Sequence, residues 1–70
     1  MITDEKILKD LGSQFKQARD LIRFKQSEVA EAAGINSSYY AQIERGEVNT
    51  TFANVYRIAK ALNIKNIEIN

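Results

Sequence analysis

The sequence contains no cysteine, no histidine and no proline, and it has only three glycines. Without cysteine and histidine, the chain cannot build a disulfide scaffold, a zinc finger, a haem attachment site or a Ser-His or Cys-His catalytic arrangement. The absence of proline and the scarcity of glycine exclude linker-like and low-complexity organisation. No run of about 18 apolar residues exists, so we expect no segment that spans a membrane.

The sequence also lacks a large excess of charge of either sign. It has ten Lys and Arg residues and nine Asp and Glu residues, for a net charge of +1. Such a balance indicates a polyanionic partner only if the basic side chains gather on one face. At 70 residues, we expect residues 1–70 to form a single domain. The first residues do not resemble a signal peptide, which favours a cytoplasmic protein. Because so small a core gives little net stability, self-association is expected.

Apolar residues recur at three- and four-residue steps along successive segments. This spacing predicts an all-α fold, a compact bundle of four to five short helices. The first helix is expected to begin at an N-cap at Thr3 and to end near Arg23, with Gly12 inside it despite the cost to helix propensity. Its apolar stripe is Ile7, Leu8, Leu11, Phe15, Ala18 and Ile22.

Two glycines are expected to end the next two helices. The second helix is predicted over residues 26–33 and stops at Gly34, which suits the left-handed conformation after a helix end. The third helix is predicted from the N-cap Asn36 to about Arg45, and Gly46 ends it in the same way. These two helices are therefore short and separated by only three residues.

A fourth helix is expected after a polar loop, with Thr51 as its N-cap. Thr51 and Asn54 are open to two roles, as helix caps or loop braces, or as contacts to a binding partner. The inner face of this helix is predicted to be Phe52, Val55, Ile58, Ala59 and Leu62. Residues 64–70 form a short tail that is either a strand or a further turn of helix.

The segment from Gln26 to Ile43 combines several requirements of a helix-turn-helix. Gly34 tolerates the positive φ of the turn, and Ala30 supplies a small side chain where the two helices cross. Apolar anchors for the pair are Val29, Ala33, Ile35, Tyr40 and Ile43. An ordinary helical hairpin is the alternative, but the combination favours a helix-turn-helix at the centre of the bundle.

The outward face of the third predicted helix lacks the Lys and Glu residues of an ordinary solvated face. It carries Asn36, Ser37, Ser38, Tyr39, Ala41 and Gln42. A helix that enters the major groove needs amides and hydroxyls for the base edges and few carboxylates near phosphate. Each polar residue, taken alone, is explained equally well as a base contact or as a surface residue without a function. Taken together, the set indicates DNA binding.

The stretch from Leu11 to Leu62 resembles the lambda-repressor-like, Cro/CI-type helix-turn-helix family, also called XRE. The matching residues are Leu11 and Gly12, Arg19, Gln26 to Ala30, Gly34 and Ile35, Tyr39, Ile43 to Gly46, and Ile58 to Leu62. The segment from Ile43 to Asn54 is also similar to the small controller proteins of restriction–modification systems. Those proteins tend to have an Asn after the Glu-Arg-Gly and another in the first turn of the next helix.

This resemblance implies roles for individual residues. Base contacts are expected from Asn36, Ser37, Ser38 and Gln42, and a glutamine can pair bidentately with adenine. Phosphate contacts are expected from Arg23, Lys25, Gln26, Tyr39, Arg45 and Asn49. The alternatives are a solvent-satisfied side chain for Gln26 and partial packing against the second helix for Tyr39.

The resemblance also implies a largely buried, structural salt bridge between Arg19 and Glu44. The sequence departs from the family at several positions. Arg23 stands where relatives commonly have Gly, and Lys25 stands where they have Ser or Thr, so the second helix has a weak N-cap. A common Pro is missing at Thr50, Tyr40 replaces an aliphatic residue, and Glu47 adds a negative charge.

The function implied is a sequence-specific DNA-binding transcriptional regulator, a homodimer on a pseudo-palindromic operator, with control of restriction–modification genes as a narrower interpretation. The dimer surface is expected to use Tyr56, Ile64, Ile67 and Ile69. The alternative is a protein-interaction module on the same fold, such as an antitoxin. An enzyme is not expected, because no carboxylate cluster or Gly-rich phosphate loop is present, and we expect no metal, cofactor or small-molecule substrate.

Overall fold

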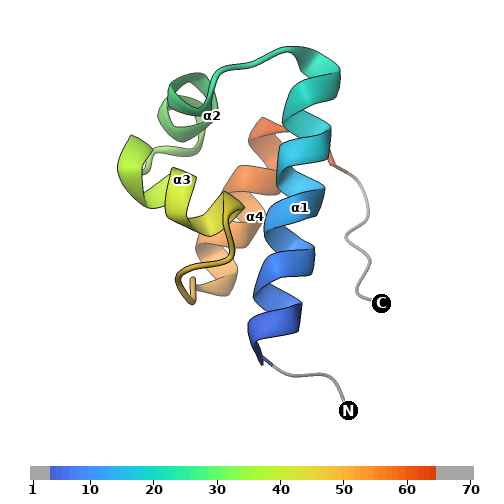
Figure 1. Cartoon of the computed structure of the whole chain (residues 1–70). Helices are drawn as coiled ribbons and strands as arrows, with labels where there is room; N and C mark the ends of the chain where they lie inside the picture. Colours follow the sequence, from blue (N-terminus) through green and yellow to red (C-terminus); the bar gives the residue numbers. More distant parts are fainter. Residues whose placement is uncertain (1–3, 65–70) are drawn as a thin grey trace.

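A computed structural model of the chain describes residues 4–64. Within that range the fold consists of four helices and no strand: α1 (Asp4–Ile22), α2 (Gln26–Ala33), α3 (Ser37–Glu44) and α4 (Phe52–Ala61). Figure 1 shows α1 running along one side of the molecule, with α2 and α3 on the other side and α4 behind. The all-α prediction is confirmed. The N-cap at Thr3 and the predictions for residues 65–70, including Ile67 and Ile69, lie outside the described residues.

Every described helix ends in the same chain reversal. One or two positions after the last residue of each helix, a residue has a positive φ. These residues are Arg23 (60°), Gly34 (72°), Gly46 (72°) and Asn63 (58°). Each of them donates its N–H to the carbonyl three residues back, and the next residue donates to the carbonyl five back, at 2.8 to 3.3 Å. This pair of bonds satisfies carbonyls that a helix end leaves free. The glycine stops at Gly34 and Gly46 are confirmed.

The helix starts follow side-chain capping. The side-chain oxygens of Asn36 and Thr51 accept the backbone N–H three residues further on, at 3.0 and 3.1 Å, so both predicted N-caps are confirmed. Lys25 before α2 has no side-chain acceptor to offer. There the Glu28 carboxylate instead accepts the Lys25 backbone N–H at 2.8 Å, which is one half of a capping box.

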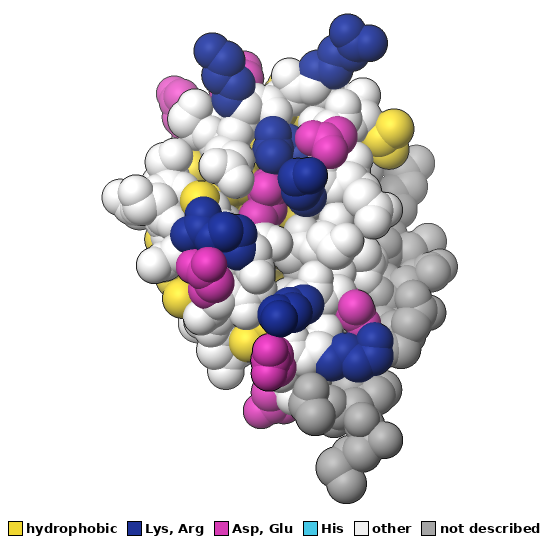
Figure 2. Space-filling model, in the orientation of Figure 1, with side chains coloured by type: hydrophobic (Ala, Val, Ile, Leu, Met, Phe, Trp, Pro, Cys, Tyr) yellow, Lys and Arg dark blue, Asp and Glu magenta, His cyan; other side chains and the backbone are white. Residues whose placement is uncertain are grey.

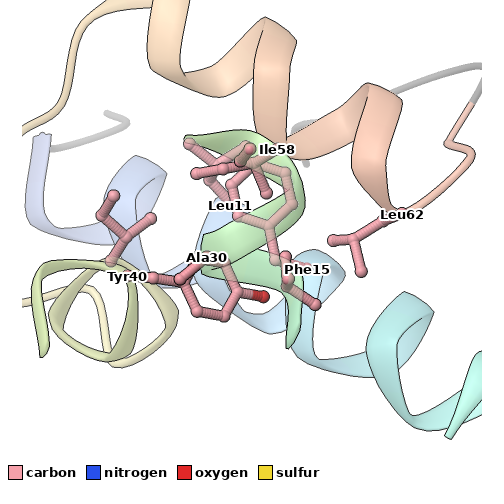
Figure 3. Packing of buried hydrophobic residues seen from close by; sticks show 9 residues of the cluster. Leu11, Phe15, Ala30, Tyr40, Ile58 and Leu62 are labelled. Carbon is pink, nitrogen blue, oxygen red and sulfur yellow. The ribbon is translucent and has the colours of Figure 1, made fainter. Parts of the chain in front are cut away.

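The core lies where all four helices meet, as Figure 3 shows for its labelled members. The buried hydrophobic residues are Leu11, Phe15, Val29, Ala30, Ala33, Tyr40, Ile43, Ile58 and Leu62. Ile22, which ends the predicted stripe of the first helix, is instead exposed in the last turn of α1. The helix-turn-helix anchors predicted from the sequence belong to this core or pack against it.

Phe52 is a wrong prediction: it was expected on the inner face of the fourth helix, and 83% of it is exposed. Successive helical residues are rotated by about 100°, which places Phe52 roughly 120° away from the buried Ile58. The same rotation places it beside Tyr56, which is 59% exposed. Helix α4 therefore carries two apolar stripes, one in the core and one facing outward.

Gly12 allows α1 and α3 to approach each other closely. A Cβ at this position would clash with the backbone carbonyl of Glu44 and would lie 2.5 Å from the carbonyl oxygen of Ile43. The sequence indicated only that Gly12 costs helix propensity. The structure shows that the cost accompanies a backbone-to-backbone contact that any larger residue would prevent.

Candidate nucleic-acid interface

Helices α2 and α3 form a helix-turn-helix. Each has eight residues, and three residues, Gly34, Ile35 and Asn36, join them. Helix α2 contacts both α3 and α4, and α1 contacts α3 from the other side. This arrangement supports α3 from behind and leaves one of its faces to solvent.

The solvent face of α3 carries the polar uncharged residues that the sequence indicated. Ser38 and Gln42 are exposed on the side opposite the buried Tyr40 and Ile43, and Ser37 is exposed in the first turn. Asn36 is exposed at the start of the helix, and its Oδ1 is occupied by the cap. Its side-chain NH2 group is therefore what it can offer outward, as a donor. The four expected base-contacting residues are thus all accessible, and Ser38 and Gln42 share one face of α3.

Arg19 and Glu44 form an ion pair between α1 and α3. Arg19 Nε donates to Glu44 Oε2 at 2.6 Å, and Nη2 donates to Oε1 at 3.2 Å. The side chains are only 15% and 3% exposed. Arg19 Nη1 also donates to the carbonyl of Phe24 at 2.9 Å. One guanidinium therefore joins α1, the turn before α2 and α3.

Gln26, at the start of α2, is attached to the same carboxylate. Its Nε2 donates to Glu44 Oε1 at 3.1 Å, and the residue is partly buried. Burial by itself would raise the pKa of Glu44, but the Arg19 guanidinium, the nearby Tyr40 hydroxyl and the Gln26 amide together outweigh it, and the pKa is lowered. Glu44 is therefore ionised and internally satisfied. Its charge is held inside the fold and does not face the solvent side of α3.

The Tyr40 hydroxyl lies near this cluster and is the one buried side-chain polar atom among residues 4–64 without a hydrogen-bond partner. Burial, together with the neighbouring Glu44 carboxylate, raises the pKa of Tyr40, so its hydroxyl stays protonated. The sequence identified Tyr40 as an aromatic residue in place of an aliphatic one. It gave no sign that the hydroxyl would be buried unpaired.

The expected phosphate contacts surround α3. Arg23, Lys25, Arg45 and Asn49 are exposed. Tyr39 is half-buried against the core, and its hydroxyl donates to Thr50 Oγ1 at 3.0 Å. A phosphate contact by Tyr39 as a donor requires the exchange of that bond. Figure 2 shows Lys and Arg side chains spread over the viewed face and interleaved with Asp and Glu, so that face is not uniformly basic.

A second exposed surface lies on α4. An open groove of about 450 Å³ is lined by Phe52, Val55, Tyr56, Ala59, Lys60, Asn63 and Ile64. Two of the expected dimer residues, Tyr56 and Ile64, line it. Phe52 belongs to the same surface, whereas the sequence placed it in the core. A helical wheel separates Phe52 from Ile58, but it does not show which of the two apolar stripes the core takes.

Two features are absent from residues 4–64. No group of three or more His, Cys, Asp or Glu residues is arranged to hold a metal ion, and no helix is long and apolar enough to cross a membrane.

Comparisons with known proteins agree with this geometry. The helix-turn-helix family profile matches residues 15–68. An uncharacterised HTH-type transcriptional regulator, y4dJ of Sinorhizobium fredii, is 33% identical over 59 residues, which cover 84% of this chain and 77% of that protein. The HTH-type transcriptional regulator SutR of Escherichia coli is 35% identical over 60 residues, which cover 86% of this chain but only 34% of SutR.

The fold also matches a solved structure, the restriction–modification controller protein C.AhdI of Aeromonas hydrophila. The TM-score is 0.79 at 29% identity, over 83% of this chain and 88% of that one. The expected resemblance is thereby confirmed. The chain belongs to the Cro/CI-type (XRE) helix-turn-helix family, whose members are DNA-binding transcriptional regulators and not enzymes.

Proposed function

We propose that this chain regulates transcription as a homodimer that binds a pseudo-palindromic DNA operator through the outward face of α3. The observation that carries the proposal is the set of exposed, uncharged hydrogen-bonding side chains on α3, namely Asn36, Ser37, Ser38 and Gln42. Behind them, the Arg19–Glu44 ion pair and Gln26 hold α3 on the body of the domain. Such a helix fits the major groove and offers few carboxylates to phosphate.

The dimer part of the proposal is supported by the outward stripe of α4. Phe52 and Tyr56 are 83% and 59% exposed, and they flank the open groove. Exposed aromatic side chains of this size on so small a domain are typical of an interaction surface. A two-fold axis near α4 presents two copies of α3 to successive major grooves, about one helical turn apart.

Control of restriction–modification genes is the narrower part of the proposal. Its support is the likeness to C.AhdI, a restriction–modification controller protein, over most of both chains. The proposal places the protein in the cytoplasm, where such genes are transcribed.

Selection of bound sequences from random duplex DNA, followed by footprinting, tests the DNA-binding part. We expect a pseudo-palindrome with half-sites about 10 base pairs apart. Gln42→Ala should then weaken operator binding by about tenfold, because a bidentate base contact contributes about 1–3 kcal/mol. Gln17→Ala, which removes an exposed glutamine from α1, is the matched control and should bind like the wild type. Unchanged operator binding by Gln42→Ala and Ser38→Ala, with loss of binding to a protein partner, would favour the interaction-module alternative.

Sedimentation equilibrium tests the dimer part. The wild-type protein should be dimeric at tens of micromolar, whereas Phe52→Ser should be monomeric and still folded by circular dichroism. Ala53→Ser changes the next exposed residue of α4 and should leave the dimer intact. A wild-type monomer at this concentration would contradict the homodimer.

A further inference from the structure

Arg45 and Glu47 form a two-bond ion pair at the end of α3. Arg45 Nε donates to Glu47 Oε2 at 2.8 Å, and Nη2 donates to Oε1 at 3.0 Å. These two N–H groups form the fork with which an arginine holds a phosphate side-on. The residue expected to contact phosphate is therefore already bound to an anion of its own chain.

The backbone fixes the position of Glu47. Gly46 has a φ of 72°, and the Glu47 N–H donates to the Gln42 carbonyl at 3.0 Å. A Cβ at Gly46 would lie 2.8 to 3.0 Å from Lys9 of α1, so the turn is also held from behind. Glu47 is thus kept at the C-terminal end of α3, one turn beyond Gln42.

An acidic residue is poorly placed there on general electrostatic grounds. The C-terminal end of a helix carries partial negative charge, which favours cations and disfavours carboxylates. The pair is also exposed, with 54% and 52% of the two side chains accessible, so it adds little to folding stability. Hydrogen bonding to Arg45 lowers the pKa of Glu47, which is therefore ionised at neutral pH.

Resting on the proposed DNA-binding function, we propose that Glu47 is an affinity-setting residue that competes with DNA phosphate for the Arg45 guanidinium. On binding, Arg45 exchanges the carboxylate for a phosphate oxygen, and the freed carboxylate is left beside the polyanion. Phosphate contacts position a protein on DNA without reading the sequence. Glu47 therefore lowers the affinity for every duplex by a similar factor and sets the protein concentration at which a site fills, without changing the choice of sequence.

The experiment compares Glu47→Gln with wild type on two probes, the selected operator and an arbitrary duplex of about 20 base pairs, or two helical turns. We expect Glu47→Gln to bind both probes about three- to tenfold more tightly. The dependence of log K on log salt should steepen by up to about 0.9 for each bound protomer, because the phosphate contact of Arg45 is no longer offset by a neighbouring carboxylate.

Two variants separate the exchange from a simple change of net charge. Glu31→Gln removes the same charge from an exposed residue that faces the groove between α2 and α4, and it should alter binding less than twofold. In an Arg45→Gln background, the gain from Glu47→Gln should also fall below twofold, because no guanidinium remains to be released.

Equal binding by Glu47→Gln and Glu31→Gln, with a wild type that binds duplex DNA, would overturn the inference alone. An undiminished gain in the Arg45→Gln background would overturn it too, since simple repulsion would then account for the effect. A folded wild type that binds neither probe at low salt would instead overturn the proposed function, and this inference with it.

Discussion

Gly12→Ala tests whether the close approach of α1 and α3 is required for folding. The new Cβ would clash with the Glu44 carbonyl and would lie 2.5 Å from the Ile43 carbonyl oxygen. A carbon atom and a carbonyl oxygen normally come no closer than about 3.3 Å. The obstacle is helix backbone and not a flexible side chain, so the two helices must move apart by about 1 Å in a core that is otherwise closely packed.

Two opposing effects set the magnitude. In an isolated helix, alanine is favoured over glycine by about 1 kcal/mol. Against this, overpacking a core costs about 1–3 kcal/mol, and here it also displaces Glu44, which is held by Arg19. Because the obstacle is backbone, the cost lies at the upper end of that range, and we expect a net destabilisation of about 2 kcal/mol, or a fall in Tm of roughly 10 °C for a domain of this size.

Circular dichroism during thermal and urea unfolding measures this difference. The protein concentration must be the same for all variants, because the Tm of a protein that dimerises depends on it. Ser13→Ala, at the exposed neighbouring position of α1, is the matched control and should change stability by no more than about 0.5 kcal/mol. If Gly12→Ala proved as stable as Ser13→Ala, propensity would dominate at this position and the close-contact argument would be refuted.

Two further substitutions test other parts of the fold. Arg23→Gly should stabilise the protein by about 1 kcal/mol in urea unfolding, because Arg23 has a φ of 60° that glycine adopts without strain; a loss of stability would contradict this. Glu44→Gln should cost about 3 kcal/mol at neutral pH by stranding Arg19. Because folding lowers the pKa of Glu44, the wild-type advantage should be full above the ordinary value of 4.5 and should shrink as the pH falls through the folded value; a difference independent of pH down to 3 would count against the pairing.

Local chemistry made the helix ends predictable from the sequence. Gly34, Gly46 and the N-caps Asn36 and Thr51 act through their own backbone neighbours, so composition and position are sufficient. The outward face of α3 was predictable for a related reason: a helix of known phase has only one side opposite its apolar residues.

Features that depend on long-range packing were not predictable in the same way. Phe52 was misplaced because α4 has two apolar stripes, and only the tertiary structure shows which one the core takes. The role of Gly12 depends on carbonyl groups more than 30 residues away. The pairing of Arg45 with Glu47 depends on the direction in which the chain reverses at Gly46, which two charges separated by one residue in a sequence do not reveal.

The outward stripe of α4 is separate from the residues that fold a protomer. Phe52 and Tyr56 lie outside the core that contains Ile58 and Leu62, so substituting them opens no cavity. If this stripe joins two protomers, a duplicated gene needs only one or two changes there before its product stops mixing with the parent. Related regulators in one cell can then evolve so that each pairs only with copies of itself, while their hydrophobic cores stay the same.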